Sequence, residues 1–248
     1  GGKRVSKYIR RILRDDPKGS KYAGELDIKS YYPSIPIRRL IWALARKIKD
    51  KRFLRTVYSI LESCGGGLAI GYYICQWLAN YYLEVLDNYI LALPGVKYME
   101  RHMDNINIFG PNKKKLHKAR TLIAEFMTKR LGVTMKGNWQ IYPVAKRMVS
   151  AVGYRFARTH TTLRKRNFLR FTRQCRRAQK KIDAGAPISH QLASGLLSRI
   201  GQLQHCDSHK IRVKYVDPIG VKNLKEVVRH ESKRRHAAQR LVHAGGAA

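Results

Sequence analysis

The chain has 248 residues, and 44% of them are hydrophobic, which is enough to bury a core and excludes a disordered basic tail. Its 51 lysines and arginines outnumber its 16 acidic residues and give a formal net charge of +35, so a polyanion such as nucleic acid is the expected partner. No stretch approaches the ~18 uninterrupted apolar residues that a membrane span needs, and no membrane partner is expected.

The first predicted elements are a helix and a buried strand. Charged residues open the chain where a signal peptide would be apolar, so the expected location is the cytoplasm or the nucleoid. Apolar residues at helical spacing predict a helix over 3–14. The run 22–28 predicts a short buried strand that Asp27 closes, and a second helix is expected after Pro33, with an apolar stripe that reaches Ile48.

A glycine run at 65–67 separates this region from another apolar helix, predicted roughly over 76–93. Residues 96–109 then predict two short strands around a tight turn, with Asp104 and Asn105 at the turn, where Asx residues tolerate unusual backbone dihedrals. The sequence predicts three further elements. These are a helix over 113–131 and two strands with alternating apolar residues over 139–144 and 148–156.

Beyond residue 164 the composition shifts to a basic amphipathic helix. Its apolar stripe recurs by steps of three and four: Phe168, Phe171, Cys175, Ala178 and Ile182. The cationic residues lie off that stripe: Arg166, Arg170, Arg173, Arg177, Lys180 and Lys181. A charge run is usually a solvated face, but few acidic residues intervene here to form helical ion pairs, which favours contact with phosphates. A further basic helix is predicted over 222–240, with fraying at 245–248.

The four cysteines indicate neither a disulfide framework nor a zinc site. They are scattered without CxxC spacing: Cys64, Cys75, Cys175 and Cys206. His205, Cys206 and His209 could ligate a metal together, but without a second cluster they are interpreted as polar surface.

Two carboxylates stand out by position, Asp27 at a strand end and Asp104 at a hairpin tip. Such positions can bring distant carboxylates together, and two like charges are then tolerated if metal ions neutralise them. Mg²⁺, with Mn²⁺ as the other candidate, prefers hard oxygen ligands, and two such ions can assist phosphoryl transfer. The pair therefore predicts a Mg²⁺ site, while an ordinary turn role for Asp104 stays open.

Four ordered segments resemble the catalytic motifs of bacterial reverse transcriptases. They are ELDIKSYYPSI at 25–35, GLAIG at 67–71 with CQWLAN at 75–80, HMDN at 102–105, and residues 131–144 with VGYRF at 152–156. The first resembles an LDIKxFYPSI motif, and the second resembles that of the diversity-generating retroelement and group II intron-like branch. HMDN falls where the family has its YxDD turn. The resemblance covers roughly 3–215, because 198–206 resembles a thumb segment.

The resemblance implies an RNA-directed DNA polymerase that copies RNA into cDNA. Asp27, Asp104 and the main chain of Ile28 match the metal site, and Asn105 falls at the second catalytic position of the turn. Tyr32 matches the aromatic gate that crowds a ribose 2′-hydroxyl, with a core aromatic as the alternative. The remaining matches are Gly71, Gln76 and, loosely, Lys136 for the nucleotide, and Gly153 and Tyr154 for the primer grip.

Three features depart from an unmodified polymerase. Asn105 replaces an acidic residue, Tyr72-Tyr73-Ile74 puts bulk where the nucleotide should approach, and too few residues precede Asp27 for a fingers module. A fragment, a partner that supplies the fingers, or a protein that no longer polymerises would each explain the last feature. A second hypothesis is therefore a degenerate reverse-transcriptase-like RNA-binding scaffold. A structural basic protein of ribosomal type would explain the charge but not the motifs.

The expected fold is α/β (α+β), a right-hand polymerase palm with a small antiparallel sheet packed on helices, followed by a mainly helical thumb. The expected domains are 1–20, the end of the fingers or a connecting helix; 21–157, the palm; and 158–248, the basic thumb and tail. Expected partners are an RNA template, a DNA primer or RNA–DNA hybrid, dNTPs, and an accessory protein or structured RNA. A bacterial or phage origin is expected.

Overall fold

The computed structural model describes residues 2–63 and 65–232, and the chain divides into two compact units. The first unit comprises Gly1–Val152 and Phe156–Thr159, and the second comprises Gly153–Arg155 and His160–Ala248. The chain therefore passes between the units after residues 152, 155 and 159.

The first unit is built on a four-stranded antiparallel sheet with the strand order β2-β3-β1-β4. The strands are β1 (Tyr22–Asp27), β2 (Tyr98–His102), β3 (Asn105–Gly110) and β4 (Gln140–Pro143). The register places Asp27 opposite Asn105, and Asn105 opposite His102 on the edge strand β2. The end of the first strand therefore lies beside the hairpin turn between β2 and β3.

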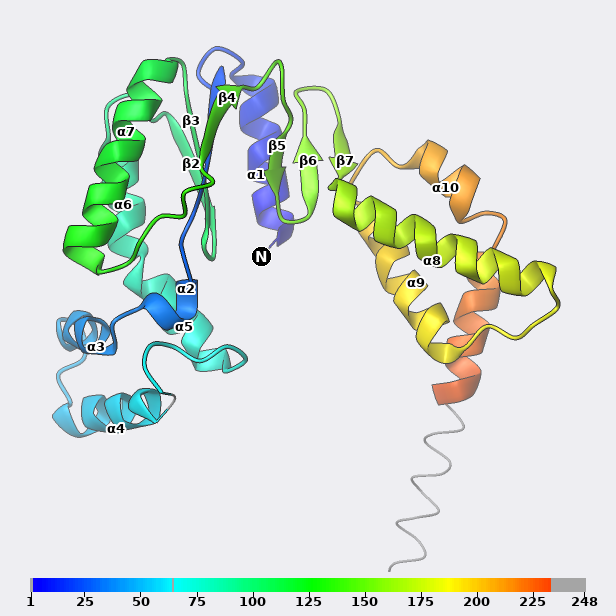
Figure 1. Ribbon diagram of the computed structural model, residues 1–248, viewed down its shortest axis with the longest axis horizontal. Helices are drawn as coiled ribbons and strands as arrows, with labels where there is room; N and C mark the ends of the chain where they lie inside the picture. The colour runs from blue at the N-terminus through cyan, green and yellow to red at the C-terminus, as the bar shows by residue number, and fades with distance from the viewer. Residues whose placement is uncertain (1, 64, 233–248) are drawn as a thin grey trace, which may run out of the picture. The chain divides into compact units, whose positions relative to one another are not determined.

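Helices lie on both sides of this sheet (Figure 1). They are α1 (Gly2–Asp15), α2 (Tyr31–Ser34), α3 (Ile37–Ala45), α4 (Lys51–Glu62), α5 (Tyr73–Tyr82), α6 (Glu84–Ala92) and α7 (Lys113–Phe126), which a π-helical turn, Met127–Leu131, extends. Alternate residues of the strands, Leu26, Ile106 and Ile108 among them, belong to the core with α6 and α7, whereas α1 lies on the other side. By this alternation Asp27 lies on the α1 side of the sheet.

The predicted helices and strands of this unit are largely confirmed, with four corrections. The predicted helix over 76–93 begins earlier, at Tyr73, and is two helices, α5 and α6, because the chain turns at the fully buried Leu83. The helix whose apolar stripe was predicted to reach Ile48 ends at Ala45. Helix α4 was not predicted. Asp50 caps it by accepting hydrogen bonds from two backbone N–H groups of its first turn. Asn105 begins β3 rather than lying in the turn.

The second unit is mainly helical. Its elements are β7 (Thr161–Leu163), α8 (Lys165–Asp183), α9 (His190–Leu203), α10 (His209–Tyr215) and a helical segment over 221–232. A three-stranded sheet has the order β5 (Val149–Ala151), β6 (Tyr154–Phe156) and β7. The predicted strand over 148–156 is therefore two strands, because Val152 and Gly153 adopt positive φ values and form a turn, and β7 was missed.

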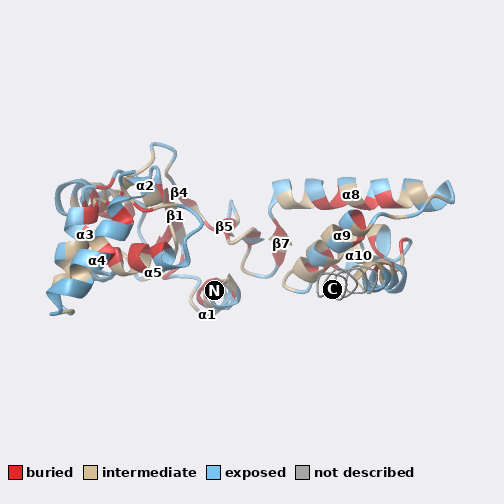
Figure 2. Cartoon of the chain, turned by 90° about the horizontal axis from the view of Figure 1, so that it is seen from below, coloured by how far each residue is buried: buried red, intermediate tan, exposed pale blue. Residues whose placement is uncertain are grey.

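The apolar stripe of α8 is buried along most of its length and its opposite face is exposed (Figure 2). Phe171, Cys175 and Ala178 are buried as predicted, and Thr172 joins them. Ile182 was wrongly placed in the stripe, because it lies near the end of the helix and is exposed. Of the predicted tail helix, 222–232 is helical, whereas 233–240, the predicted frayed end and Cys64 lie outside the described residues. In the described part of the chain, no helix is long and apolar enough to span a membrane.

Candidate active site

Asp27 and Asp104 lie together at one end of the first sheet. Asp27 is the last residue of β1, and Asp104 lies in the turn between β2 and β3, beside the strand that pairs with β1. The Ile28 N–H donates a hydrogen bond to the Asp104 carbonyl oxygen, N···O 3.1 Å, which ties the strand end to the turn. Met103 adopts a φ of 57°, the left-handed conformation that this tight turn requires. Neighbouring strands thus bring together two carboxylates that are far apart in the sequence.

The electrostatics of this pair are unfavourable for two charged carboxylates. Burial raises the pKa of Asp104 above its ordinary value, and the nearby Asp27 carboxylate raises it further. The Oδ1 atom of Asp27 is buried and accepts no hydrogen bond, although buried carboxylate oxygens are normally paired. Among residues 2–63 and 65–232, no group of three or more His, Cys, Asp or Glu side chains gathers in a metal-binding arrangement. The unpaired oxygen and the carboxylate pair nevertheless fit a hard cation held by two side chains and main-chain or water oxygens.

Lys136 lies against Asp27, far closer to the pair than its loose sequence match indicated. Its Nζ atom donates to Asp27 Oδ2 at 2.8 Å, and its backbone N–H donates to the Asp27 carbonyl oxygen at 2.8 Å. The side-chain hydrogen bond to Asp27 raises the pKa of Lys136, so the ammonium is charged at neutral pH. On the other carboxylate, the Asn105 amide donates to Asp104 Oδ1 at 2.9 Å. Each aspartate therefore has one oxygen engaged by a neighbouring donor.

Replacing Asp104 by asparagine is expected to stabilise the metal-free protein at neutral pH. A carboxyl with a raised pKa favours folding only while it is protonated, and this contribution is lost as the pH rises through the raised pKa. Asp104→Asn should therefore raise Tm in EDTA at pH 7.5 by about 2–4 °C, the shift that ~1 kcal/mol produces in a chain of this size. The gain should shrink as the pH falls below the titration of Asp104.

Asp15→Asn is the matched control for that measurement. Asp15 is exposed, and the hydrogen bond from Arg14 lowers its pKa, so its substitution should give no gain at neutral pH. Mg²⁺ should raise Tm of the unchanged protein and have little effect on Asp104→Asn. Equal Tm values for Asp104→Asn and the unchanged chain in EDTA would contradict the interpretation of the pair.

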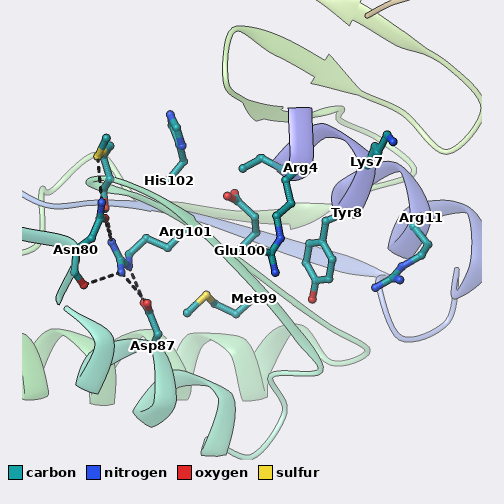
Figure 3. A pocket seen from close by; sticks show the side chains of 12 residues that line it. Arg4, Lys7, Tyr8, Arg11, Asn80, Asp87, Met99, Glu100, Arg101 and His102 are labelled. Atoms are coloured by element: carbon teal, nitrogen blue, oxygen red, sulfur yellow. Dashed lines mark hydrogen bonds and ion pairs between the residues drawn. The ribbon is translucent and has the colours of Figure 1, made fainter. Parts of the chain in front are cut away.

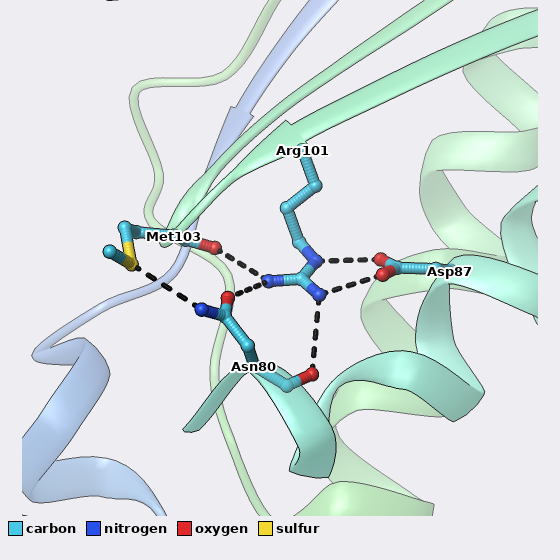
Figure 4. Close-up of polar contacts among 4 residues, drawn as sticks. All are labelled: Asn80, Asp87, Arg101 and Met103. Atoms are coloured by element: carbon cyan, nitrogen blue, oxygen red, sulfur yellow. Dashed lines mark hydrogen bonds and ion pairs between the residues drawn. The ribbon is translucent and has the colours of Figure 1, made fainter. Parts of the chain in front are cut away.

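Arg101 connects the hairpin turn to helices α5 and α6 by hydrogen bonds (Figure 4). Its guanidinium binds both oxygens of Asp87, Nε to Oδ1 at 2.6 Å and Nη2 to Oδ2 at 2.7 Å. Its Nη1 also donates to Asn80 Oδ1 at 3.0 Å and to the Met103 carbonyl oxygen at 3.2 Å. The Met103 sulfur in turn accepts contacts from Asn80 and from the Tyr32 hydroxyl. The residue before Asp104 is therefore held by α5, α6 and the segment that follows Asp27.

Arg101 was not among the predicted site residues. Asp87 on the largely apolar helix 84–92 was the available signal, because an acidic residue beside buried apolar residues needs a partner. The Arg101 side chain is 8% exposed, so its ion pair with Asp87 is largely buried.

Replacing Arg101 by methionine is expected to lower the free energy of unfolding by about 3–5 kcal/mol, because the substitution leaves the Asp87 carboxylate without its partner. Denaturation in urea measures this loss. Lys47→Met is the control, since it breaks the exposed Lys47–Glu84 pair and should cost less than ~1 kcal/mol. The double variant Arg101→Met/Asp87→Leu should recover part of the stability. Similar losses for Arg101→Met and Lys47→Met would contradict the proposed role.

Tyr32 lies next to the Asp27–Asp104 pair, and the glycine loop over 65–71 contacts Tyr32. The Tyr32 hydroxyl contacts the Met103 sulfur at 3.7 Å, which places this ring beside the hairpin turn. Burial raises the pKa of this hydroxyl, and the Asp104 carboxylate raises it further. The Leu68 N–H donates to the Tyr32 carbonyl oxygen at 2.9 Å, and a Cβ on Gly67 would lie 2.2 Å from the Pro33 carbonyl oxygen. Only glycine permits this approach. Gly71 and Gln76 are exposed farther along the same loop and on α5.

The remaining predicted site residues belong to the second unit. The Gly153 carbonyl oxygen accepts hydrogen bonds from Arg164 N–H and from the Asn167 side chain, and the buried Tyr154 donates its hydroxyl to the Gln202 carbonyl oxygen. These contacts join the predicted primer grip to α8 and α9. The predicted phosphate-binding residues of α8 are exposed, and Lys181 is partly so: Arg166, Arg170, Arg173, Arg177, Lys180 and Lys181.

The sequence matches no protein-family model and no curated protein sequence significantly. Its structure is similar to that of apo telomerase from Candida tropicalis, with a TM-score of 0.56 and 12% identity over 95% of this chain and 46% of that chain. The C. tropicalis telomerase in complex with a TWJ fragment of telomeric RNA gives a TM-score of 0.53 and 11% identity, over 86% of this chain and 43% of that one. The apo form truncated from its C-terminal domain gives 0.51 and 12%, over 66% and 39%.

This chain therefore spans less than half the length of the telomerase chains that it matches. At such low identity the likeness concerns the fold. The mixed α/β first unit with its small antiparallel sheet and the helical second unit confirm the predicted fold class. The fold of this chain therefore resembles that of telomerase.

Proposed function

We propose that this chain is the palm and thumb of an RNA-directed DNA polymerase. The observation that carries the proposal is the meeting of Asp27 and Asp104 at a strand end and an adjoining hairpin turn, with one buried carboxylate oxygen left unpaired. The basic face of α8 adds a surface for phosphates, and one of the similar telomerase structures is in complex with telomeric RNA. The proposed partners are an RNA template, a DNA primer and dNTPs.

Asp27, Asp104 and the carbonyl oxygen of Ile28 would hold Mg²⁺ or Mn²⁺, which would neutralise charge on the phosphates of the incoming nucleotide. Lys136 and Asn105 orient the two carboxylates by the hydrogen bonds described above. Arg101 keeps the turn in place, so that little reorganisation is needed when nucleotide and primer bind. Tyr32 beside the turn would crowd a ribose 2′-hydroxyl and so favour deoxynucleotides.

A second candidate function is an RNA-binding scaffold without polymerase activity. Two observations favour it: Lys136 already neutralises Asp27, and Asn105 stands where the family has an acidic residue. The proposed bacterial or phage origin rests on the sequence motifs. We also propose an accessory protein or a structured RNA as a partner.

Extension of a labelled DNA primer on an RNA template, with dNTPs and with or without Mg²⁺, tests the proposal. The unchanged chain and Asn105→Asp should both extend the primer in Mg²⁺ and neither should in EDTA. Asn105→Asp removes the donor to Asp104 and adds a negative charge, so it should need a different Mg²⁺ concentration for half-maximal extension. RNA binding without extension by either protein would favour the scaffold.

A further inference from the structure

A cavity of about 1050 Å³ lies in the first unit beside the edge strand β2 (Figure 3). Helix α1 lines one side of it, and β2 lines the other, with contributions from α5 and α6. The α1 residues are Arg4, Val5, Lys7, Tyr8 and Arg11. Met99, Glu100 and His102 from β2 face it together with the residues around Arg101. The proposed polymerase chemistry gives this cavity no role.

Glu100 is the chemically unusual residue of the cavity. It is 7% exposed, and its Oε1 atom is buried without a hydrogen-bond partner. Its Oε2 atom accepts one long hydrogen bond, 3.3 Å, from the Asn107 amide on β3. None of the ion pairs of the described residues includes Glu100, although a buried carboxylate without a partner is costly. Burial accordingly raises the pKa of Glu100. The wall of the cavity therefore contains a carboxylate oxygen that lacks a hydrogen-bond donor.

The α1 side of the cavity carries positive charge and an aromatic ring. Arg4, Lys7 and Arg11 are exposed and lie at helical spacing on one face, with Tyr8 partly buried among them. Arg11 lies over the Tyr8 ring, 5.6 Å from its centroid. Neither Arg4 nor Lys7 forms an ion pair within the described part of the chain. The cavity is thus lined by the buried carboxylate of Glu100, the Tyr8 ring and the cationic side chains of Arg4 and Lys7.

We propose that this cavity binds a guanine nucleotide, with the base against Glu100 and Tyr8 and the phosphate on Arg4 and Lys7. Guanine is favoured among the bases because its N1–H and N2–H are adjacent donors, which match the unpaired Oε1 of Glu100 and its Oε2, which accepts only one long hydrogen bond. Adenine presents one amino group beside a ring acceptor, and that acceptor would face a carboxylate oxygen. The ligand is either a free nucleotide or an unpaired guanosine of an RNA strand. Binding of guanine in this cavity requires no polymerase activity.

Equilibrium dialysis with GMP and AMP in EDTA tests the choice of base. The two nucleotides carry the same phosphate, so attraction to a basic protein is the same for both. GMP should bind about 10- to 100-fold more tightly than AMP, because the buried carboxylate pairs only with guanine. IMP, which lacks the 2-amino group, should bind with intermediate affinity. Equal affinities for GMP and AMP would overturn the proposal.

Glu100→Gln should remove the preference for GMP while leaving AMP binding unchanged. Glu125→Gln, which changes an exposed glutamate on α7, is the matched control and should keep the preference. Arg4→Ala/Lys7→Ala should weaken GMP and AMP equally, because these residues contact only the phosphate. Far-UV circular dichroism checks that each variant is folded. A preference for GMP that survives in folded Glu100→Gln would also overturn the assignment.

Two further experiments identify the source of the ligand and distinguish this cavity from the Asp27–Asp104 site. Asp104→Ala should bind GMP as the unchanged chain does, because dialysis in EDTA requires no metal at Asp27 and Asp104. Short RNAs that differ only by an unpaired G or A should compete with GMP to different extents if the ligand is part of a strand. Equal competition by the two RNAs, with the GMP preference retained, would identify a free nucleotide.

Discussion

Primer extension on an RNA template is expected to fall at least about 10³-fold when Asp104 or Asp27 is replaced by alanine. Both carboxylates lie where β1 meets the hairpin turn, and each would supply oxygen ligands that no other described acidic side chain there can replace. Single-nucleotide incorporation in Mg²⁺ measures the loss. Because neither residue contributes to the basic face of α8, RNA affinity should be unchanged.

Asp15→Ala is the control for this pair of variants. Asp15 is exposed at the end of α1 and is paired with Arg14, so its removal should leave extension intact. Extension by Asp104→Ala at the rate of the unchanged chain would show that the acidic pair is not the metal site. Loss of both extension and RNA binding would indicate a folding defect, which the circular dichroism spectrum would reveal.

RNA affinity is expected to fall about 10²-fold at 0.15 M salt when Arg166, Arg170 and Arg173 are all replaced by alanine. These side chains are exposed on one face of α8, opposite the buried Phe171 and Cys175. Each phosphate contact contributes roughly 0.7–0.9 to the slope of log affinity against log salt, so the slope should decrease by about 2–3. Filter binding across a salt series measures both quantities.

Lys113→Ala/Lys114→Ala/Lys118→Ala is the matched control, because it removes the same charge from exposed positions on α7. A specific α8 interface predicts that this control changes the slope by less than the α8 variant does. The unchanged chain, if it contacts six to ten phosphates, should itself lose about 10³–10⁵ in affinity between 50 and 200 mM salt. Identical slopes for the two triple variants would contradict a dedicated phosphate-binding face and indicate a general effect of net charge.

The positions of Asp27 and Asp104 could be predicted because they depend on local signals. A short apolar run that ends on an aspartate and a hairpin with an aspartate at its tip each leave a clear pattern in the sequence. The pairing of β1 with β3 then brings the two residues together. The same reasoning located most helices, because their apolar stripes repeat at helical spacing.

The contacts between distant segments could not be predicted in this way. Lys136 is 109 residues from Asp27 in the sequence, and its match to the family motif gave no sign of a direct ion pair. The Arg101 interactions depend on the position of α6 against β2. The burial of Glu100 depends on how α1 lies beside the edge strand. The break at Leu83 was missed because the apolar pattern continues through it. Periodicity reports which face of an element is buried but not which side chains meet across two elements.

The course of the chain between residues 152 and 160 limits how the two units can be separated by evolution. Exchange of domains by recombination works best at a single junction, where few contacts cross. Here residues 153–155 belong to the second unit and 156–159 to the first. A second unit transplanted from residue 160 onward would lose Gly153, which accepts hydrogen bonds from Arg164 and Asn167, and Tyr154, which donates to Gln202. This junction favours the inheritance of both units as one piece.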